Sequence, residues 1–260
     1  YRDMEMKELK EWFINAGSVL VAYSGGLDST LVAYIANKVL NENALAITIK
    51  TIFIDEDEIE YAINNARNLG IKHRVVELDL PESILENPRD RCYICKKHIM
   101  RKLKEIAKKE GYSWIVDGTN YDDLSENRPG IVALKEEGIR SPLIELKIGK
   151  ARIKELSKEL GLNYRRSSNA CLATRFPYGY KISLEDLRMV ANAERIIRDE
   201  GFEVVRVRHF GTMAKIEVGK EEISKIIQQR QSLVYKLKSI GYKVVALDLE
   251  GYSSGKMDLI

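Results

Sequence analysis

Short apolar runs alternate with amphipathic segments over roughly the first 165 residues of the chain. Runs rich in Val, Ile and Leu are typical of strands buried on both faces of a sheet, and they occupy residues 18–24, 44–50, 72–80 and 113–118. Apolar residues at helical spacing predict helices at 4–15, 28–40, 55–70, 92–110 and 150–161. This alternation predicts an α/β fold, a doubly wound, mainly parallel sheet with helices on both faces.

The pattern changes after residue 165. A predicted helix at 184–200 precedes strands at 203–211 and 214–219, and a second helix at 220–240 precedes a last strand at 243–250. This αββαβ order predicts a smaller C-terminal α+β domain. We place the boundary near residue 175, which gives domains at 1–175 and 176–260.

The stretch SGGLDST at residues 24–30 lies between the first predicted strand and the helix that follows it. Gly25 and Gly26 allow the backbone to bend sharply and to approach an anion, and the N–H groups at a helix start favour a phosphate. Asp28 is a candidate N-cap of this helix, or a ligand of a magnesium ion. Hydroxyl donors in the same stretch come from Ser24, Ser29 and Thr30. The stretch predicts a phosphate-binding loop at the carboxyl edge of the sheet, where doubly wound folds bind ligands.

This loop contains no lysine, unlike the Walker A pattern G-x-x-x-x-G-K-[ST]. A Walker lysine serves transfer of the γ-phosphoryl group. A loop that holds the outer two phosphates as one unit suits a different reaction, in which an acceptor attacks the α-phosphorus of ATP and pyrophosphate leaves. The alternative is an ordinary strand–helix turn closed by two glycines.

Composition limits the class of protein. The 42 Lys and Arg residues nearly balance the 39 Asp and Glu residues, so the charge does not predict a nucleic-acid partner. No apolar run approaches the ~20 residues of a membrane span, and no signal-peptide core is present. Three cysteines, an odd number, argue against a disulfide framework and direct attention to metal binding or catalysis. We expect a cytoplasmic protein without membrane association that forms a homo-oligomer.

Five more stretches carry chemistry: NPRDRCYICKKH at 87–98, DGTNYDDLSENRPG at 117–130, SPLIEL at 141–146, CLATRFPYG at 171–179 and RVRHFGTMAKIE at 206–217. The loop SGGLDST is similar to the pyrophosphate loop (PP-loop) of the ATP-pyrophosphatases. Together the six stretches resemble the LarE family of pyridinium-3,5-biscarboxylic acid mononucleotide sulfurtransferases over nearly the whole chain.

The resemblance implies an adenine nucleotide alpha hydrolase-like domain at 1–175 that binds ATP, and a substrate and sulfur-transfer domain at 176–260. It also implies a reaction. ATP adenylates a carboxylate of a small pyridinium nucleotide, and sulfur from sulfide or another donor then displaces AMP. The thiocarboxylates formed belong to the nickel-pincer nucleotide cofactor of lactate racemase.

The resemblance further assigns roles to residues. Cys171 matches the cysteine that single-cysteine members sacrifice as a sulfur donor. Besides the loop, ATP contacts are expected from Ala22, Thr48, Gly118, Asn120 and Arg175. Magnesium ligands are expected at Asp28, Asp117 and Asp123. The alternative for Gly118 and Asn120 is that they are ordinary turn residues.

Charged residues in the second predicted domain suggest an anion site. Arg206 and Arg208 alternate along a predicted strand, so they share one face and could clamp a phosphate or carboxylate. The alternative is a solvated strand edge. Glu194, on the preceding predicted helix, could pair with them, hold a metal or be a solvated charge. Cations near Cys171 in the sequence would favour its thiolate, and these are Arg165, Arg166 and Arg175.

Cys92 and Cys95 are three residues apart on a predicted helix and therefore share a face. With Cys171 they could hold a [4Fe–4S] cluster with one open iron that carries an extra sulfide. The resemblance favours this interpretation, because three-cysteine members are associated with such a cluster. The alternatives are a zinc site that adds His98, a redox disulfide, two buried cysteines, and the sacrificial route without a cluster.

Three other functions compete. A [4Fe–4S]-dependent tRNA thiolation enzyme would need a basic RNA-binding face or module. A synthetase that uses ammonia would leave the three cysteines without a role. A non-enzymatic adenine-nucleotide sensor would bind ATP and release no pyrophosphate.

Overall fold

A computed structural model of the chain describes residues 2–125, 129–162 and 171–259. The chain forms two compact units, of which the first contains residues 1–80 and 90–168 and the second contains residues 81–89 and 169–260. The predicted boundary near residue 175 leaves the segment 81–89 in the first domain, whereas in the structure this segment belongs to the second unit. Arg165 and Arg166 lie outside the described residues.

The first unit is an α/β fold with four strands. Its strands are β1 (Val19–Ala22), β2 (Ala44–Lys50), β3 (His73–Glu77) and β4 (Trp114–Val116). Its helices are α1 (Arg2–Ala16), α2 (Leu27–Leu40), α3 (Glu56–Asn68), α4 (Arg91–Glu110), α5 (Pro129–Glu136), α6 (Pro142–Glu145) and α7 (Lys150–Glu159). Two 3₁₀ turns complete it, η1 (Asn41–Asn43) and η3 (Tyr121–Ser125). Helices α5 and α6 were not predicted, because each is too short to show a helical period.

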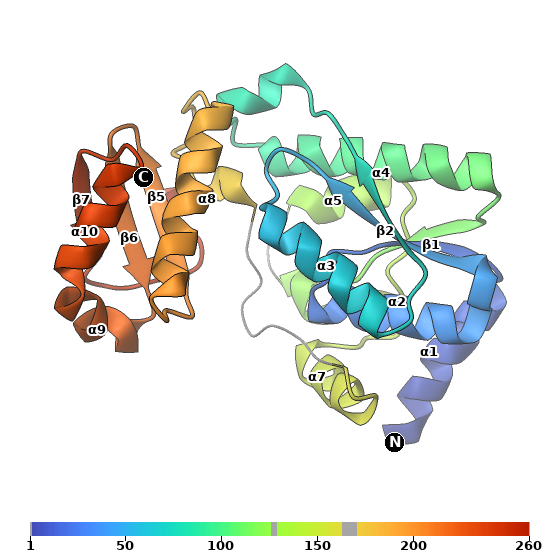
Figure 1. Cartoon of the computed structure of the whole chain (residues 1–260). Coiled ribbons are helices and arrows are strands. Elements are labelled where there is room, and N and C mark those ends of the chain that lie inside the picture. Colours follow the sequence, from blue (N-terminus) through green and yellow to red (C-terminus); the bar gives the residue numbers. More distant parts are fainter. Residues whose placement is uncertain (1, 126–128, 163–170, 260) are drawn as a thin grey trace. The chain divides into compact units, whose positions relative to one another are not determined.

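The sheet of the first unit is parallel throughout, with the order β3-β2-β1-β4 (Figure 1). Alternate residues of a strand point to opposite faces. Val19 and Val21 pack with α1, α2, α3 and α7 on one face, while Leu20 packs with α4 and α5 on the other. The predicted fold class is therefore confirmed.

The strand order reverses between β1 and β4. From β1 the chain continues to β2 and β3 on one side, and it then crosses to β4 on the other side. Doubly wound folds bind ligands at such a switch point, outside the carboxyl ends of the two central strands. The loops that follow β1 and β4 are SGGLDST and DGTN, so the topology brings two of the quoted motifs together.

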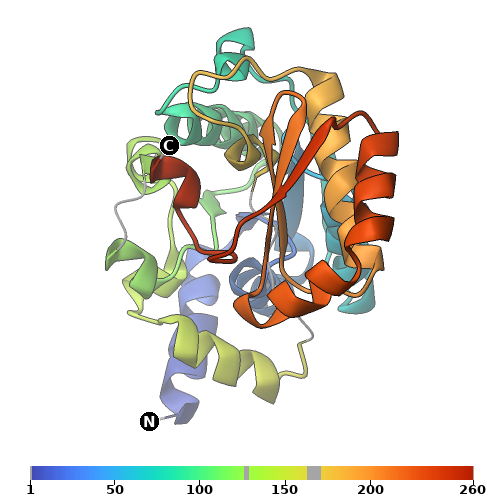
Figure 2. The same cartoon turned by 90° about the vertical axis from the view of Figure 1, so that its left-hand side faces the viewer.

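The second unit is a small α+β fold, shown from two directions in Figures 1 and 2. It contains α8 (Leu184–Asp199), β5 (Val205–Phe210), β6 (Met213–Val218), α9 (Ile223–Gln228), α10 (Arg230–Ser239) and β7 (Val244–Leu247). Its 3₁₀ turns are η2 (Glu82–Glu86), η4 (Leu172–Arg175), η5 (Lys220–Glu222) and η6 (Lys256–Leu259). Strand β6 lies between β5 and β7, antiparallel to β5 and parallel to β7. Helices α8 and α10 cover one face of this sheet, and the core there includes Val205 and Val207.

The prediction of one continuous helix at 220–240 is wrong. The chain forms η5 first, and α9 and α10 are separated at Gln229. Apolar residues keep the same spacing on both sides of Gln229, so the pattern does not reveal that the helix is interrupted at this one residue. Helix α8 begins as predicted, with a capping box in which Ser183 and Asp186 bond each other's backbone N–H groups.

None of the helices in the described part of the chain combines the length and the apolar character that a transmembrane segment requires.

Candidate functional site

The phosphate loop turns directly from β1 into α2. Gly25 adopts a left-handed conformation with φ of 82°, and a Cβ there would approach Ala62 at 3.1 Å. Both facts require glycine at this position. Gly26, with extended backbone, is the N-cap of α2, and it provides no side-chain cap. The prediction of Asp28 as the N-cap is therefore wrong, because the helix already begins at Leu27.

Hydroxyl groups inside the loop fix its shape. The buried Ser29 hydroxyl accepts a hydrogen bond from Ser24 N at 3.2 Å and donates one to Gly26 O at 3.2 Å. It also lies 3.0 Å from the Ser24 hydroxyl. Thr30 is buried and accepts a hydrogen bond from Asn65, which also donates to the Tyr23 hydroxyl. Ser29 and Thr30 therefore hold the loop in place, and Ser24 is the hydroxyl residue that faces solvent.

The loop after β4 touches the loop after β1. A Cβ on Gly118 would lie 2.6 Å from Ser29 N and 2.9 Å from Asp28 C, so only glycine fits there. The fully buried Asn120 donates from Nδ2 to Asp28 Oδ2 at 2.7 Å. The first-turn N–H groups of a helix have no partner within the helix. The structure thus brings these two motifs together at the start of α2, where N–H groups favour an anion.

The predicted magnesium ligands do not converge. Asp117 is buried and accepts hydrogen bonds from Ser141 Oγ at 2.5 Å and from Thr119 Oγ1. Asp123 is also buried, accepts a bond from the backbone N of Asn120, and lies 3.3 Å from Lys150 Nζ. Both carboxylates stabilise the loop after β4. Within the described ranges, no group of three or more His, Cys, Asp and Glu side chains could hold a metal ion.

Thr48 and Ala22 lie at or near the carboxyl ends of β2 and β1. Thr48 is buried and donates to Tyr23 O at 2.8 Å, and its hydroxyl lies 2.7 Å from His73 Nε2. Burial lowers the pKa of His73, so its imidazole is neutral at pH 7. Ala22 is half-buried at the last position of its strand. These contacts support the shape of the loop, and ATP contacts at Ala22 and Thr48 stay predictions.

Two of the three cysteines, Cys92 and Cys95, belong to the first unit, and Cys171 belongs to the second. Cys92 and Cys95 are in the first turns of α4, and Cys92 is exposed while Cys95 is half-buried. Cys171 is exposed and is the N-cap of η4. None of the three forms a disulfide. His98 follows Cys95 by three residues on α4 and is half-buried. The Cys92–Cys95 pair therefore has the shared helix face that the spacing predicted.

A buried ion pair lies beside the Cys171 turn. Arg175 is 0% exposed, and it donates to both carboxylate oxygens of Glu194, at 2.6 and 3.1 Å. Its NH1 group donates to Thr174 Oγ1 at 2.8 Å and to the carbonyl of Cys171 at 3.4 Å. A guanidinium so enclosed has no surface for a nucleotide, so the structure disfavours Arg175 as an ATP contact. Its bonds hold the turn that carries Cys171.

Glu194 is the centre of this arrangement. It is 1% exposed, and it also accepts a bond from Val207 N at 3.0 Å. Burial raises the pKa of its carboxyl, but the charge and hydrogen bonds of Arg175 and the Val207 N–H outweigh burial and lower it. The prediction was that Glu194 could pair with Arg206 and Arg208, hold a metal or be solvated; its ion pairs in the structure are instead with Arg175, and with Arg198 at 3.4 Å.

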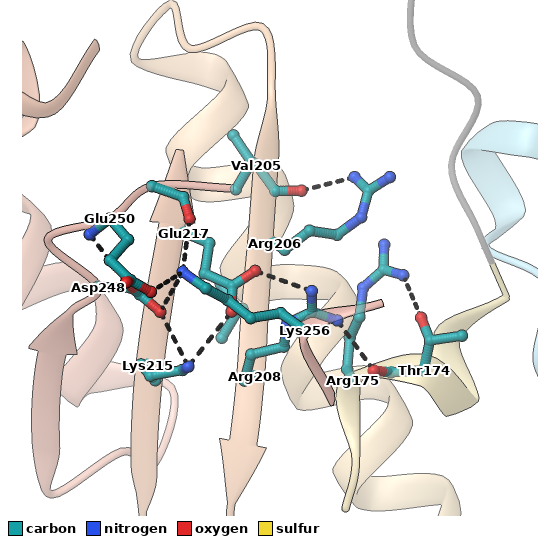
Figure 3. Close-up of polar contacts among 12 residues, drawn as sticks. Thr174, Arg175, Val205, Arg206, Arg208, Lys215, Glu217, Asp248, Glu250 and Lys256 are labelled. Atoms are coloured by element: carbon teal, nitrogen blue, oxygen red, sulfur yellow. Dashed lines mark hydrogen bonds and ion pairs between the residues drawn. The ribbon is translucent and has the colours of Figure 1, made fainter. Parts of the chain in front are cut away.

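Arg206 and Arg208 share a face of β5 and are both buried (Figure 3). Arg208 donates to Glu217 Oε2 at 2.8 Å and to Thr174 O at 2.9 Å. Arg206 donates to Val205 O at 2.8 Å, and its guanidinium carbon lies 5.0 Å from the centroid of the Tyr252 ring. The solvated strand edge is thus wrong for both.

Positive charge exceeds negative charge at this place. The described part of the second unit buries Arg175, Arg206 and Arg208 with the carboxylates Glu194 and Glu217. Burial lowers the pKa of Arg206, and the neighbouring charge of Arg175 lowers it further. Guanidinium groups bind phosphates and carboxylates through paired hydrogen bonds, so these arginines form a candidate anion site.

Comparison with known proteins extends these observations to the whole chain. A family model described as NAD synthase matches residues 7–107, which include the phosphate loop. An uncharacterized protein of Synechocystis is 40% identical over 263 aligned positions, which cover 99% of this chain and 98% of that protein. The pyridinium-3,5-bisthiocarboxylic acid mononucleotide synthase of Lactiplantibacillus plantarum is 34% identical over 244 positions, which cover 92% of this chain and 88% of that protein. The chain belongs to the LarE family.

A relative whose name gives a different activity is less similar in sequence. A glutamine-hydrolyzing GMP synthase protein of Pyrococcus horikoshii is 26% identical over 213 positions, which cover 75% of this chain and 68% of that protein.

Several residues that form hydrogen bonds or ion pairs in this LarE-family site were given no role from the sequence. Tyr23 and Asn65 form hydrogen bonds but lie outside the quoted stretches, and Thr174 lies within CLATRFPYG but was given no role. Glu217 could have been found, because it lies opposite Arg206 across the predicted hairpin of β5 and β6.

Proposed function

We propose that this chain is an ATP-dependent sulfurtransferase that converts the carboxylates of pyridinium-3,5-biscarboxylic acid mononucleotide to thiocarboxylates. The Lactiplantibacillus relative, which matches across both units, carries this proposal. The site geometry supports it, because the chain combines a phosphate loop without lysine, three cysteines and a buried cluster of arginines.

The first unit would perform the activation. The substrate carboxylate attacks the α-phosphorus of ATP, the bond to the β-phosphate breaks, and pyrophosphate leaves with the electron pair. The start of α2 would hold the leaving pyrophosphate through backbone N–H groups. Gly118 and Asn120 keep that helix start in position. Magnesium would accompany the ATP phosphates, with Asp28 as the best-placed carboxylate of the loop.

The second unit would hold the acceptor. Arg206 and Arg208 would bind the phosphate or the second carboxylate of the substrate. In the sulfur step, a sulfur nucleophile attacks the acyl carbon, the bond from that carbon to the AMP oxygen breaks, and AMP leaves. Arg175 and Glu194 would fix the Cys171 turn for this step through the bonds described above.

A [4Fe–4S] cluster is ordinarily held by four cysteine thiolates, so three would leave one iron without a protein ligand. Soft thiolate ligands suit iron–sulfur clusters rather than magnesium. Cys92 and Cys95 would hold one edge, and Cys171 would complete the set. When bound, the cluster would supply an iron with an open position for exogenous sulfide. The rivals are a zinc site that includes His98 and the sacrificial route, in which Cys171 Sγ is transferred and its Cβ–Sγ bond breaks.

The test is an anaerobic reaction with ATP, sulfide and the pyridinium dicarboxylate mononucleotide. Mass spectrometry would follow the substrate and the intact protein, and iron, zinc and acid-labile sulfide would be measured. We expect AMP and pyrophosphate with each thiocarboxylate, several turnovers per chain, and no loss of protein mass. Cys92→Ser should abolish sulfur transfer, because two thiolates would be left to hold the cluster.

Each rival gives a different result. Loss of the mass of one hydrogen sulfide per sulfur delivered, with Cys92→Ser still active, would establish the sacrificial route. Stoichiometric zinc without iron would exclude the cluster. Absence of AMP formation with this substrate would refute the proposed function itself, and binding of tRNA with a steep salt dependence would favour the thiolation of RNA.

A further inference from the structure

The segment that follows β7 in the second unit is fastened to the neighbouring strand β6. Asp248 N donates to Ile216 O at 2.9 Å, and Tyr252 N donates to Val218 O at 2.8 Å. The segment therefore continues along β6 after β7 has ended. We call residues 248–257 the strap.

Gly251 shapes the strap directly before Tyr252. Its backbone is left-handed, with φ of 74°, and a Cβ there would lie 3.0 Å from Val218 O. Both facts favour glycine. Gly251 N donates to Asp248 O at 3.1 Å and closes a turn of four residues. The backbone that leads into Tyr252 is thus held in one conformation.

Lys256 fastens this turn through its side chain. It is only 8% exposed, and its Nζ donates to Gly251 O at 2.9 Å. The same ammonium lies 2.9 Å from Asp248 Oδ2 and 3.2 Å from Glu250 Oε2 (Figure 3). A buried ammonium is stable only where oxygen atoms replace its water. The strap is therefore held by directional polar contacts.

A row of alternating charges continues from this fastening to β5 (Figure 3). Lys215 Nζ lies 3.0 Å from Asp248 Oδ2 and 3.3 Å from Glu217 Oε1. Glu217 Oε2 in turn accepts a hydrogen bond from Arg208 at 2.8 Å. The strap and the arginines of β5 therefore belong to one polar network inside the second unit.

Tyr252 brings an aromatic ring to Arg206. The separation of 5.0 Å between the guanidinium carbon and the ring centroid is within the range of a cation–π contact. The two other buried arginines of this cluster, Arg175 and Arg208, are held by glutamate carboxylates. A carboxylate takes up N–H donors and neutralises the charge, whereas a ring contacts the face of a guanidinium and does neither. A stacked ring is thus a suitable support for an arginine that binds a ligand.

We propose that Tyr252 is a positioning residue for the candidate anion site: its ring, held by the strap, orients the guanidinium of Arg206 so that the in-plane N–H groups meet a phosphate. This inference rests on the proposed function for its ligand, which would be the phosphate of the pyridinium nucleotide. The binding of a simpler nucleotide can be measured without any sulfur chemistry.

The test compares Tyr252→Leu with the parent protein. Leucine keeps an apolar side chain and removes the ring, while Tyr252→Phe keeps the ring and removes the hydroxyl. Tyr235→Leu is the matched control, because it makes the same change at a tyrosine of α10 that is 77% exposed. The probes are nicotinamide mononucleotide and inorganic phosphate, titrated into the full chain in a calorimeter.

We expect Tyr252→Leu to bind both probes roughly fivefold more weakly, since the loss of a cation–π contact is of this size. Tyr252→Phe should retain most of the affinity, and Tyr235→Leu should match the parent. Melting curves and ATP binding would show that each variant is folded. If Tyr252→Leu does not fold, Lys256→Met decides, because it removes the fastening of the strap and keeps the ring. It should also bind the probes more weakly, and affinity equal to that of the parent would overturn the inference.

A double-mutant cycle tests whether Tyr252 acts through Arg206. In an Arg206→Gln background, Tyr252→Leu should cause no further loss of affinity for nicotinamide mononucleotide. A merely structural role would weaken binding equally in both backgrounds and would overturn the inference.

Other outcomes are equally clear. Equal affinity in folded Tyr252→Leu would contradict the proposal, and tighter binding would show that the ring covers Arg206 instead of orienting it. A parent protein that binds neither probe would have no anion site for Tyr252 to serve, which also overturns the inference. If the affinities change as expected but the pyridinium dicarboxylate mononucleotide is not thiolated, the positioning role is upheld and the proposed function fails separately.

Discussion

Substitution of Gly118 by alanine tests how the two loops of the first unit work together. The added Cβ would lie 2.6 Å from Ser29 N and 2.8 Å from Ser29 Cα, well inside van der Waals contact, and both atoms belong to the backbone. Gly118 is not in the left-handed region, so alanine meets no conformational penalty there. Overpacking of this kind costs about 1–3 kcal/mol.

That cost should fall mainly on ATP binding. The atoms that must move belong to the first turn of α2, whose N–H groups would hold the phosphates. The hydrophobic core behind α2 contains many residues that this shift does not reach, so global stability should change less. A loss of about 1.4 kcal/mol corresponds to a tenfold weaker affinity. We therefore expect ATP to bind roughly tenfold more weakly to Gly118→Ala, with a smaller decrease in melting temperature.

Isothermal titration calorimetry with ATP and thermal unfolding would measure the two effects. Gly130→Ala is the control: it places the same methyl group in α5, where its nearest neighbour is Lys96 Cγ at 3.9 Å. Alanine in a helix is favoured over glycine by about 1 kcal/mol, so this variant should bind ATP like the parent and melt no lower. If Gly118→Ala also matched the parent in both measurements, the close approach of the two loops would not exist in solution.

Three further predictions concern the charges of the second unit. Glu194→Gln should lower the free energy of unfolding at pH 7 by about 3–5 kcal/mol, because it leaves the buried Arg175 without its counter-charge. The pKa of Glu194 is lowered in the folded state, so this stabilisation is present above about pH 4.5 and is lost as the pH falls further. If urea titrations showed the same difference in unfolding free energy between variant and parent at acidic pH, this assignment would be contradicted. Asp248→Asn should lower the free energy of unfolding at pH 7 by roughly 2 kcal/mol, because burial raises the pKa of Asp248 but hydrogen bonds from Lys256 and Lys215 lower it to about 2. The unfolding free energy of the parent should therefore decline between about pH 4 and pH 2. A decline of equal size in the variant would refute the assignment. Arg206→Lys should weaken binding of nicotinamide mononucleotide about tenfold, since lysine cannot form the bidentate contact, and unchanged affinity in calorimetry would remove this residue from the substrate site.

Much of the first unit could be predicted because its signals are local. The runs at β1 and β2 are apolar throughout, as expected for strands covered on both faces, and the glycines of the loop stand where a strand meets a helix. The order β3-β2-β1-β4 could not be predicted, because no local pattern records which strands are neighbours. Asp28 was predicted as the N-cap, but α2 begins at Leu27 and its N-cap is Gly26. The backbone angles that decide where a helix begins cannot be read from the type of residue alone.

The candidate site was less predictable because its parts act through partners distant in sequence. Arg175 lies close to Cys171 in the sequence and was expected to meet ATP, but its burial follows from Glu194, on a different helix. Asp117 and Asp123 have the composition of a magnesium site, and only the positions of Ser141 and other neighbours show that they stabilise a loop. The side chain of Asn87 donates to the carbonyl groups of Phe176 and Pro177, which are 89 and 90 residues away, and no spacing in the sequence indicates this contact.

The buried charges around Cys171 are better explained by their role in positioning the backbone of this turn than by a contribution to the stability of the fold. Replacing a buried ion pair with apolar side chains of similar volume is often neutral or stabilising, because the desolvation of both charges is avoided. Thr174 nevertheless meets the guanidinium groups of both Arg175 and Arg208, through its hydroxyl and its carbonyl. Each of these arginines is held by its own buried glutamate, Glu194 or Glu217. Two separate ion pairs thus converge on one short turn, and an apolar core could not fix that backbone with the same directional bonds.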